Sequence, residues 1–574
     1  MNSTRVVESR AESNTIRESP ENGIAGLKHL RYDIISGIVV SLVSLPLSSG
    51  IAIASGVPPI YGLISAIIAG LIFPFIGGSY VTIAGPAAGL APALVAVMVS
   101  LGGVGDAQHV GAGYPFLLCV IFIVGFVQMF LAILKLARFA AIIPVSVVEG
   151  MLASIGLLII VKQLPLFFGY TGTLKPHEFF EFVRATPAYA AEMTGPVFTV
   201  SIATLALLFI FGRMKDARFL RIVPPQLVAV VLGVILGQVM QLGSMAEGRF
   251  LISLPKDPFH GAALPDFNSL FSHQELWYAV TIAVITLTLI DGVESLATAM
   301  AIDRIDPFQR KSQPNRVLLA MGVCNVASSV VGGLTIIPGG VKSKANIASG
   351  GRTLWANFTN AICLILYLVV ARDLINLIPM GVLAAVLIYT GWKMCEPLVW
   401  KHMAQIGKHQ LGIFVITIVS TLMTDLLWGI IIGTSAKFLL NMLLYRQSLL
   451  AVQSTTPSPT LFRAVLDFFS NPVSKREVEQ DVYHLYLDKP LVCFNSMRLS
   501  DELERIPENV REIYIHLDCH VSVIDHTSCE NLMEAIDQFS HKNVVVTIVG
   551  LDQMKRLSKY HAGARLATPA MSGH

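Results

Sequence analysis

The ten residues Gly77–Pro86 read Gly-Gly-Ser-Tyr-Val-Thr-Ile-Ala-Gly-Pro, and the nine residues Gly332–Gly340 read Gly-Gly-Leu-Thr-Ile-Ile-Pro-Gly-Gly. Each copy has two glycines, a Thr-Ile pair and a Pro/Gly break. The break leads into a segment too short to cross a bilayer, Pro86–Val99 in the first copy and Val341–Ser349 in the second. Paired interrupted segments at corresponding places of two halves are typical of a transport site at the membrane midplane. The alternative is chance recurrence, because Gly and Pro are frequent in membrane helices.

Apolar stretches long enough, or nearly long enough, to cross a bilayer recur on both sides of these segments. A spanning helix needs about 17–25 mostly apolar residues. We expect spans at Ile34–Ser55, Ile60–Ile76, Pro115–Leu134, Ile142–Val161, Val197–Phe211, Leu227–Met240, Leu276–Ala301, Val317–Val331, Leu354–Val370, Val382–Trp392 and Leu411–Leu444. The last is long enough for two helices separated near Thr424–Asp425, so the two short segments bring the total to about fourteen. The sequence therefore predicts an all-α polytopic membrane domain over residues 33–447.

Charged residues are rare and unevenly distributed. Asp, Glu, Lys and Arg make up 14% of the 574 residues, against about 25% in a typical soluble domain. The last 124 residues hold 28 of these 79 charges, which leaves the first 450 at 11%. The net charge is only +3 and there is no dense basic stretch, so nucleic acid is not an expected partner. These values are typical of a membrane protein with a soluble C-terminal part, and the lipid bilayer is its first expected partner.

Basic residues near span ends predict the orientation, because Lys and Arg there favour the cytoplasm. They gather at alternate connections, which are 135–138, 213–221, 304–316 and 393–408. The N-terminal tail, residues 1–32, is polar and carries no signal peptide. We therefore expect a multi-pass protein of the plasma (cell inner) membrane with both termini in the cytoplasm.

The C-terminal part changes pattern after a Ser/Thr/Pro-rich linker, residues 448–475. Segments 482–487, 512–517 and 544–549 alternate like strands, whereas 500–506 and 529–539 have helical spacing. Strands alternating with helices predict a small soluble α/β domain over residues 476–562, followed by a disordered tail at 563–574.

The starts of the two short segments are the candidate anion site. A helix N-terminus carries about half a positive charge and unpaired N–H groups, which attract anions. Small residues leave this backbone bare, and Lys342 lies just inside the second helix. An intramembrane lysine costs roughly 2.5–3.5 kcal/mol, so Lys342 is expected to add fixed positive charge to the anion site. The alternative is that Lys342 and Lys344 reach towards water from a short loop, which is the expectation for Lys344. The predicted anion-binding residues are Ser48, Ala87, Ala88, Gly89, Gly339, Gly340, Val341 and Lys342. The alternative is close helix packing by small residues.

Glu294 is the second costly residue, inside the apolar stretch Leu276–Ala301. Asp291 lies one turn before it, and Thr298 lies one turn after it on the same helix face. A carboxylate and a hydroxyl so placed suit Na⁺ as a coupling ion, and Glu294 and Thr298 are its predicted metal ligands. The same carboxylate could instead carry a proton. The alternative for Glu294 is a structural hydrogen bond to a neighbouring helix. No other cofactor is expected, since the seven cysteines lack metal-type spacing.

At these residues the chain resembles the sulfate permease family, also called solute carrier family 26, over about residues 27–560. The supporting stretches are Pro46–Pro59, Gly85–Gly89, Gly156–Gly169 and, most specifically, Pro338–Thr353 (PGGVKSKANIASGGRT). The region that follows resembles a sulfate-transporter and anti-sigma-antagonist (STAS) domain. The resemblance implies a fourteen-helix fold of two inverted seven-helix repeats, arranged as a core and a gate domain.

The same resemblance implies site residues. The family's anion site lies between the third and tenth helices, which correspond to the two short segments. Lys342 falls where many members carry an arginine that faces the anion. Glu294 and Thr298 fit the positions that bind sodium in a sodium-dependent bicarbonate transporter of the family. Leu47 stands where many sulfate-transporting members have glutamine, so bicarbonate is expected ahead of sulfate.

In the STAS-like region, Leu517-Asp518 and residues 524–528 resemble the loop that opens a helix. His526 occupies the place of the phosphorylated serine of the anti-sigma antagonists, so that switch does not transfer. Thr527 and Ser528 remain candidate regulatory targets, with helix capping as the alternative. The family uses this domain for dimer contacts and regulation, so a homodimer and a cytoplasmic regulator are expected partners.

The sequence thus predicts a secondary active transporter of a small inorganic anion, coupled to Na⁺ or H⁺ and working by elevator-type alternating access. Bicarbonate is the first expected substrate, and sulfate or a C4-dicarboxylate at the same site is the alternative. An alternative of another class is an anion-sensing receptor or scaffold that signals through the STAS domain. An enzyme is not expected, because no Ser-His-Asp, metal or phosphate-loop pattern is present.

Overall fold

The computed structural model describes residues 19–567 except 107, 138–142, 173, 175, 177–178, 215–223, 246–248, 255–262, 304, 425, 453–460, 480, 508–509, 519–520 and 542–543. Most of the predicted N-terminal tail, the end of the C-terminal tail, Asp425 and part of the predicted basic connections therefore lie outside the described residues. Within them, eight helices are long and apolar enough to cross a membrane.

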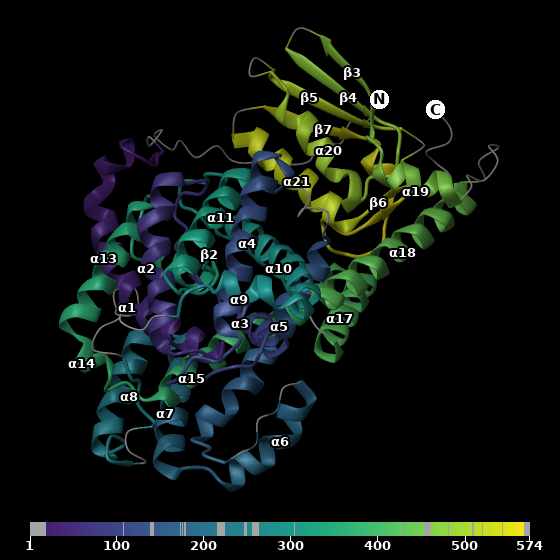
Figure 1. Cartoon of the computed structure of the whole chain (residues 1–574). Coiled ribbons are helices and arrows are strands. Elements are labelled where there is room, and N and C mark those ends of the chain that lie inside the picture. The colour runs from purple at the N-terminus through teal and green to yellow at the C-terminus, as the bar shows by residue number, and fades with distance from the viewer. Residues whose placement is uncertain are drawn as a thin grey trace.

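The membrane part consists of two bundles of helices, with the α/β domain at one end (Figure 1). The first bundle holds α1 (Leu30–Ala54), α2 (Pro59–Ile76), α3 (Ala91–Ser100), α4 (Tyr114–Ile133), α10 (Trp277–Asp303), α11 (Pro314–Val330), α12 (Gly340–Ala348) and α13 (Trp355–Val370). The second bundle holds α5 (Val145–Phe168), α7 (Gly195–Arg213), α8 (Pro225–Val239), α15 (Met380–Met394), α17 (Lys408–Met423) and α18 (Leu426–Val452). Shorter helices connect them: η1 (Ala25–His29), α6 (Phe179–Ala191), α9 (Phe267–Ser272), η5 (Gln274–Leu276), α14 (Arg372–Ile375) and α16 (Pro397–Ile406).

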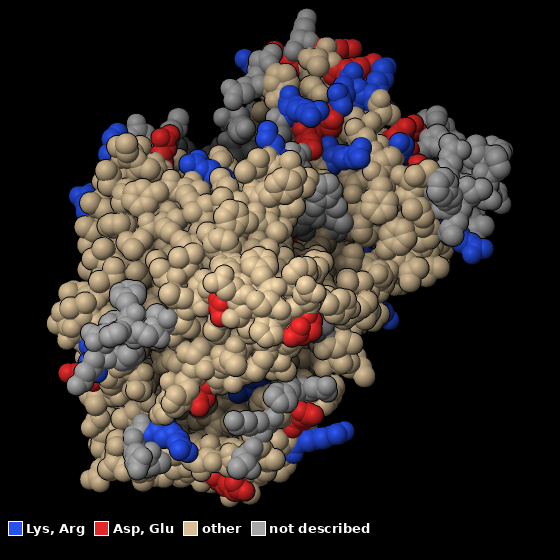
Figure 2. Space-filling model, in the orientation of Figure 1, with Lys and Arg blue, Asp and Glu red and all other residues tan. Residues whose placement is uncertain are grey.

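The surface is consistent with a bilayer around this part. Figure 2 shows a broad belt with few charged residues over the helical bundles, while Lys, Arg, Asp and Glu gather over the α/β domain and the helix ends beside it, and again at the opposite end of the bundles. Large apolar side chains are exposed on the helices, including Val369 (76%) and Ile133 (68%). Exposed apolar area of this extent is stable only against lipid or another protein.

The two interrupted segments meet as a short antiparallel strand pair, which the sequence alone did not predict. β1 (Ala84–Pro86) pairs with β2 (Ile336–Pro338), with Gly85 opposite Ile337. The predicted start of the first short helix at Pro86 is wrong, because Pro86 belongs to β1 and α3 begins only at Ala91. Pro92 is the proline that occupies the first turn of α3, where a missing N–H costs nothing. The second short helix starts at Gly340, one residue before the predicted position.

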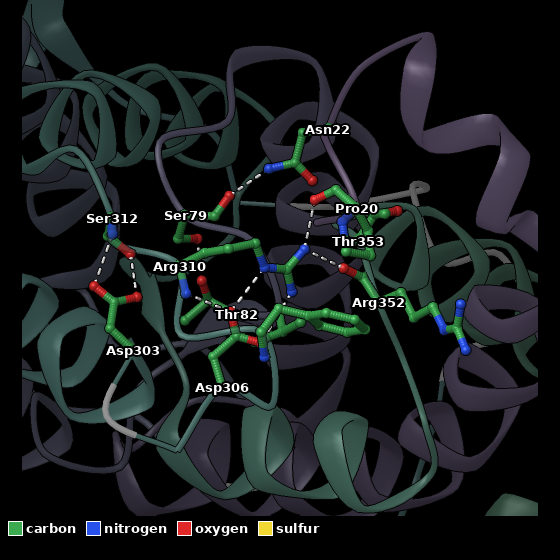
Figure 3. Close-up of polar contacts among 12 residues, drawn as sticks. Pro20, Asn22, Ser79, Thr82, Asp303, Asp306, Arg310, Ser312, Arg352 and Thr353 are labelled. Carbon is green, nitrogen blue, oxygen red and sulfur yellow. Dashed lines mark hydrogen bonds and ion pairs between the residues drawn. The ribbon is translucent and has the colours of Figure 1, made fainter. Parts of the chain in front are cut away.

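A buried polar cluster lies at one end of the first bundle, and Figure 3 shows its contacts. Beside it, Lys311 pairs with Glu534 of the α/β domain at 3.0 Å. Arg310 donates through Nε and Nη2 to Asp306, at 2.7 and 3.0 Å, and through Nη1 to the carbonyls of Pro20 and Arg352. Asn22 donates to the Ser79 carbonyl at 2.6 Å. Residues 20–22, part of the predicted tail, are thus fastened to the connections that lead into β1 and out of α12.

The α/β domain contains a four-stranded sheet of order β3-β4-β5-β7, formed by β3 (Val473–Glu479), β4 (Val482–Leu487), β5 (Glu512–Leu517) and β7 (Val545–Val549). β4, β5 and β7 are parallel, and β3 is antiparallel to β4. A second sheet has the order β6-β9-β8, from β6 (Val523–Ile524), β9 (Arg565–Leu566) and β8 (Lys555–Arg556). The remaining elements are α19 (Leu461–Phe469), α20 (Cys493–Glu504), α21 (His526–His541) and η6 (Leu551–Gln553). The three strands predicted from alternation fall on β4, β5 and β7.

Candidate functional site

Two buried asparagines hold the strand pair at the centre of the first bundle. On α13, Asn357 accepts from the Ala84 N–H at 2.8 Å and donates to the Thr82 carbonyl at 2.7 Å. On α11, Asn325 accepts from the Ile336 N–H at 2.6 Å. Each strand is therefore fixed by a side-chain amide that replaces the partners a longer sheet would supply, which is required where no water is present.

The start of α12 presents free backbone donors beside this strand pair. Gly339 is its N-cap and has no side chain to accept from the first turn. In the described part of the chain, no acceptor meets the N–H groups of Gly340, Val341 and Lys342. Three such donors at the positive end of a helix favour an anion.

The start of α3 lies across the strand pair and is preceded by a turn. Ala88 and Gly89 belong to this turn, and Ala87 directly precedes it. They do not lie in the first turn of the helix, as predicted. All three lack a large side chain, so the backbone remains accessible to a small ligand.

Lys342 points from α12 towards β1 and α1. Its Nζ donates to Ser48 Oγ at 3.0 Å, and a Cβ added to Gly85 would lie 2.5 Å from the same nitrogen. The side chain is 1% exposed. No carboxylate of the described residues forms an ion pair with it, so two of its three N–H donors remain available to a ligand.

Glu294 approaches the same region from α10. A Cβ atom added to Gly89 would lie only 2.7 Å from Cδ of Glu294 and would collide with the carboxylate. The Glu294 side chain therefore lies directly against the turn before α3. Glu294 is 6% exposed and its Oε2 has no hydrogen-bond partner in the structure. Thr298 lies near the start of α12, since a Cβ on Gly340 would be 3.8 Å from its Cγ2.

Asp291 has a different environment, which the sequence did not indicate. Its Oδ2 accepts from Asn325 Nδ2 at 3.0 Å, and Ser295 Oγ donates to its Oδ1 at 3.1 Å. Asn325 also donates to Gln128 of α4. Asp291 is thus part of the network that fixes β2, whereas Glu294 one turn later has an unpaired oxygen. Among the described residues, no group of three or more His, Cys, Asp or Glu could hold a metal ion.

The loop before α21 joins the α/β domain to the last membrane helix. Lys437 of α18 lies 3.4 Å from Asp525 Oδ2, and Cys493 N–H and Ser528 N–H also donate to this carboxylate. Burial alone would raise the pKa of Asp525, but Lys437 and these N–H groups outweigh it, and the pKa lies below its ordinary value. Thr527 and Ser528, the predicted regulatory targets, are 4% and 1% exposed. A modifying enzyme could reach them only if this part of the α/β domain opened locally.

Comparison with known proteins agrees with this architecture. The model of the Sulfate permease family matches residues 30–417. A putative sulfate transporter, YvdB of Bacillus subtilis, is 26% identical over 421 residues, 72% of this chain and 73% of the relative. A bicarbonate transporter, BicA of Synechocystis, is 24% identical over 542 residues, 91% of this chain and 88% of the relative.

Two solved structures are similar in fold. The transmembrane domain of a cyanobacterium bicarbonate transporter, BicA, superposes with a TM-score of 0.61 at 24% identity, covering 70% of this chain and 98% of that domain. The overall structure of SLC26A9 gives a TM-score of 0.62 at 14% identity, covering 90% of this chain and 84% of that protein. At these identities the likeness shows the fold.

Proposed function

The chain belongs to the sulfate permease family of membrane anion transporters, and from this premise we propose that it carries bicarbonate together with a cation. It is a multi-pass membrane transporter and not an enzyme. The proposal concerns the substrate, the coupling and the motion, and each part is supported by the geometry of the first bundle.

Coupling is the part that a single observation supports best: Glu294 lies against the turn that precedes α3. An ionised carboxylate there would repel an anion from one of the two helix starts that should hold it. Neutralising Glu294, by Na⁺ shared with Thr298 or by a proton, removes this repulsion and leaves both positive helix ends for the anion. Binding of the cation and of the anion would therefore favour each other, as symport requires.

A small monovalent anion suits the donors at this site. They are the N–H groups at the start of α12, one lysine and the hydroxyl of Ser48. Leu47, 6% exposed, offers no amide beside them. Among the relatives, some are named as bicarbonate transporters and others as putative sulfate transporters, so sulfate is the competing substrate, with a C4-dicarboxylate as a further alternative.

The motion we propose is an elevator movement of the first bundle, as core, against the second bundle, as gate. In this proposal the chain consists of two inverted seven-helix repeats, and each repeat contributes helices to both bundles. The polar cluster around Arg310 and the strand pair support it, because they tie the first bundle into one unit. In this proposal both termini are cytoplasmic, in the plasma membrane, and two chains form a homodimer.

Uptake into proteoliposomes tests the proposal. Counterflow of labelled bicarbonate, sulfate and succinate is measured while Na⁺ and proton gradients are varied separately. We expect bicarbonate uptake driven by one of the two gradients, and loss of that coupling in Glu294→Gln with normal protein levels. Glu275→Gln, in the exposed turn η5 directly before α10, is the matched control. Bicarbonate that neither enters nor competes would overturn the substrate assignment, and unchanged cation dependence in Glu294→Gln would overturn the coupling.

A further inference from the structure

A cavity of about 610 Å³ lies where the second bundle meets the α/β domain. On the membrane side it is lined by Gly407, Lys408 and His409, at the connection between α16 and α17. On the domain side it is lined by Leu557, Lys559 and Tyr560. None of these residues belongs to the proposed transport site, and the volume is in the range of sites for organic ligands rather than a single small ion.

The charged side chains that line this cavity are all basic. Lys408 and Lys559 are exposed, His409 adds a third group that can carry positive charge, and no acidic residue lines the cavity. In the described part of the chain neither lysine forms an ion pair, unlike Lys393 nearby, which pairs with Glu396 at 2.9 Å. Two unpaired ammonium groups facing one space repel each other, and a bound anion would relieve this repulsion.

The backbone adds donors to the same space. α17 begins at Lys408, its N-cap Gly407 has no side chain, and the N–H groups of Gln410 and Leu411 already bond to the Gly407 carbonyl. No acceptor among the described residues meets the N–H groups of Lys408 and His409. A helix start with free donors beside two lysines is the combination that proteins use for phosphate oxygens.

Ring contacts make the cavity a junction between the two parts of the protein. The ring of Tyr560 packs 5.7 Å from the ring of His402 on α16 and 5.8 Å from that of His526 at the start of α21. A Cβ on Gly407 would lie 3.6 Å from Ser558 Cβ, so α17 and the 557–560 segment touch directly. A ligand held by Lys408 and Lys559 would therefore bridge the membrane part and the α/β domain.

We propose that this cavity binds a phosphate group, carried either by a soluble molecule or by a lipid headgroup. A soluble molecule can reach it because Lys408 and Lys559 are exposed, and a lipid headgroup can reach it because the neighbouring helix α16 exposes apolar Leu398 (66%), as a helix at a membrane surface does. The bound phosphate neutralises the two lysines, accepts from the start of α17 and holds the 557–560 segment against the second bundle.

Lysine footprinting of the full-length protein tests this assignment. The protein is placed in phosphatidylcholine nanodiscs, and acylation of individual lysines is followed by mass spectrometry. One arm adds inorganic pyrophosphate as the soluble probe, and the other replaces part of the phosphatidylcholine by phosphatidic acid. We expect one of the probes to slow acylation of Lys408 and Lys559 together by about tenfold, with Lys401 as the internal control. The arm that protects identifies the source.

The double variant Lys408→Gln, Lys559→Gln should weaken binding of that probe by at least about tenfold, as two lost lysine–phosphate attractions imply. Lys401→Gln is the matched variant and should bind normally. Equal slowing of Lys401 would show general attraction to the surface and overturn the site. So would the absence of protection by both probes, or full binding by the double variant. The lysine footprint of the unaltered protein tests the proposed phosphate site even where the double variant does not fold.

Discussion

Replacing Lys342 by methionine is expected to stabilise the fold and impair anion transport at the same time. The substitution keeps the length of the side chain and removes its charge. Lys342 is 1% exposed, its ammonium has one hydrogen bond, to Ser48 at 3.0 Å, and no carboxylate of the described residues pairs with it. The protein contacts of this ammonium therefore offset only part of the free-energy cost of its burial.

The expected change in the free energy of unfolding follows from two opposing contributions. A lysine at the bilayer centre costs roughly 2.5–3.5 kcal/mol, and one hydrogen bond from a charged donor returns about 1.5–3 kcal/mol. Methionine removes both, so the free energy of unfolding should rise by about 1 kcal/mol. The anion, in contrast, loses a unit charge close to its site. At an effective dielectric constant near 20 this attraction is worth at most about 4 kcal/mol, which limits the effect to about a thousandfold. We expect the half-saturation concentration to rise by between about tenfold and about a thousandfold.

Thermal unfolding in detergent and initial uptake rates over a range of anion concentrations measure the two effects. Lys344→Met is the matched control, because Lys344 lies two residues further along α12 and is exposed, so neither quantity should change. A lower unfolding midpoint in Lys342→Met would show that the ammonium is a structural group. An unchanged half-saturation concentration would show that it does not face the anion.

Three further perturbations have defined outcomes. Gly89→Ala should abolish uptake while the protein still folds, because the new methyl group displaces the Glu294 carboxylate, 2.7 Å away at Cδ; uptake assays and size-exclusion profiles measure this. Arg310→Ala should destabilise the first bundle by about 3–5 kcal/mol, since it leaves Asp306 buried without its partner; thermal unfolding measures this. Because the pKa of Asp525 is lowered in the folded protein, its ionised carboxylate stabilises the fold at pH values above its ordinary pKa of 3.8. This stabilisation is lost as the pH falls through the pKa of the folded state. Limited proteolysis between pH 6 and 3 should therefore show the α/β domain separating from the membrane part below about pH 4.

Each of these outcomes has a control. Gly340→Ala adds a methyl group with only ordinary contact, 3.8 Å from Thr298, so it should fold and transport better than Gly89→Ala. Arg316→Ala removes an exposed arginine in the first turn of α11, whose hydrogen bond to the Ile76 carbonyl is also exposed, and should be nearly neutral for stability. Asp525→Asn should remove the acid-dependent step; a step that persists in this variant would assign the acid sensitivity to another group.

The sequence predicted the elements of the fold well because membrane spans are decided by local composition. The glycine-rich breaks, both short helices and the separation of α17 from α18 follow from hydropathy and from Gly and Pro alone. α16 was missed because its polar and apolar residues alternate around the helix, which is the pattern of a helix lying on the membrane and not crossing it.

The partners of the site residues could not be predicted, because they come from distant parts of the chain. Lys342 and Ser48 are 294 residues apart, and Asn325 and Gln128 are 197 apart. Lys342 and Glu294 could be identified from the sequence, because a charged side chain inside an apolar segment has an unfavourable insertion free energy. Whether each is paired depends on neighbours that a single sequence does not identify, so the contrast between Asp291 and Glu294 appears only in three dimensions.

The strand pair of β1 and β2 also provides a fixed internal reference. With Asn357 and Asn325 clamping its two strands, Gly85 and Ile337 should keep one separation in every state of the transport cycle. Distances from this pair to labels on α5 or α17 would then report the displacement of the two bundles relative to each other, without a contribution from changes within the strand pair. A spectroscopic measurement on this protein can therefore use the strand pair as its fixed reference point.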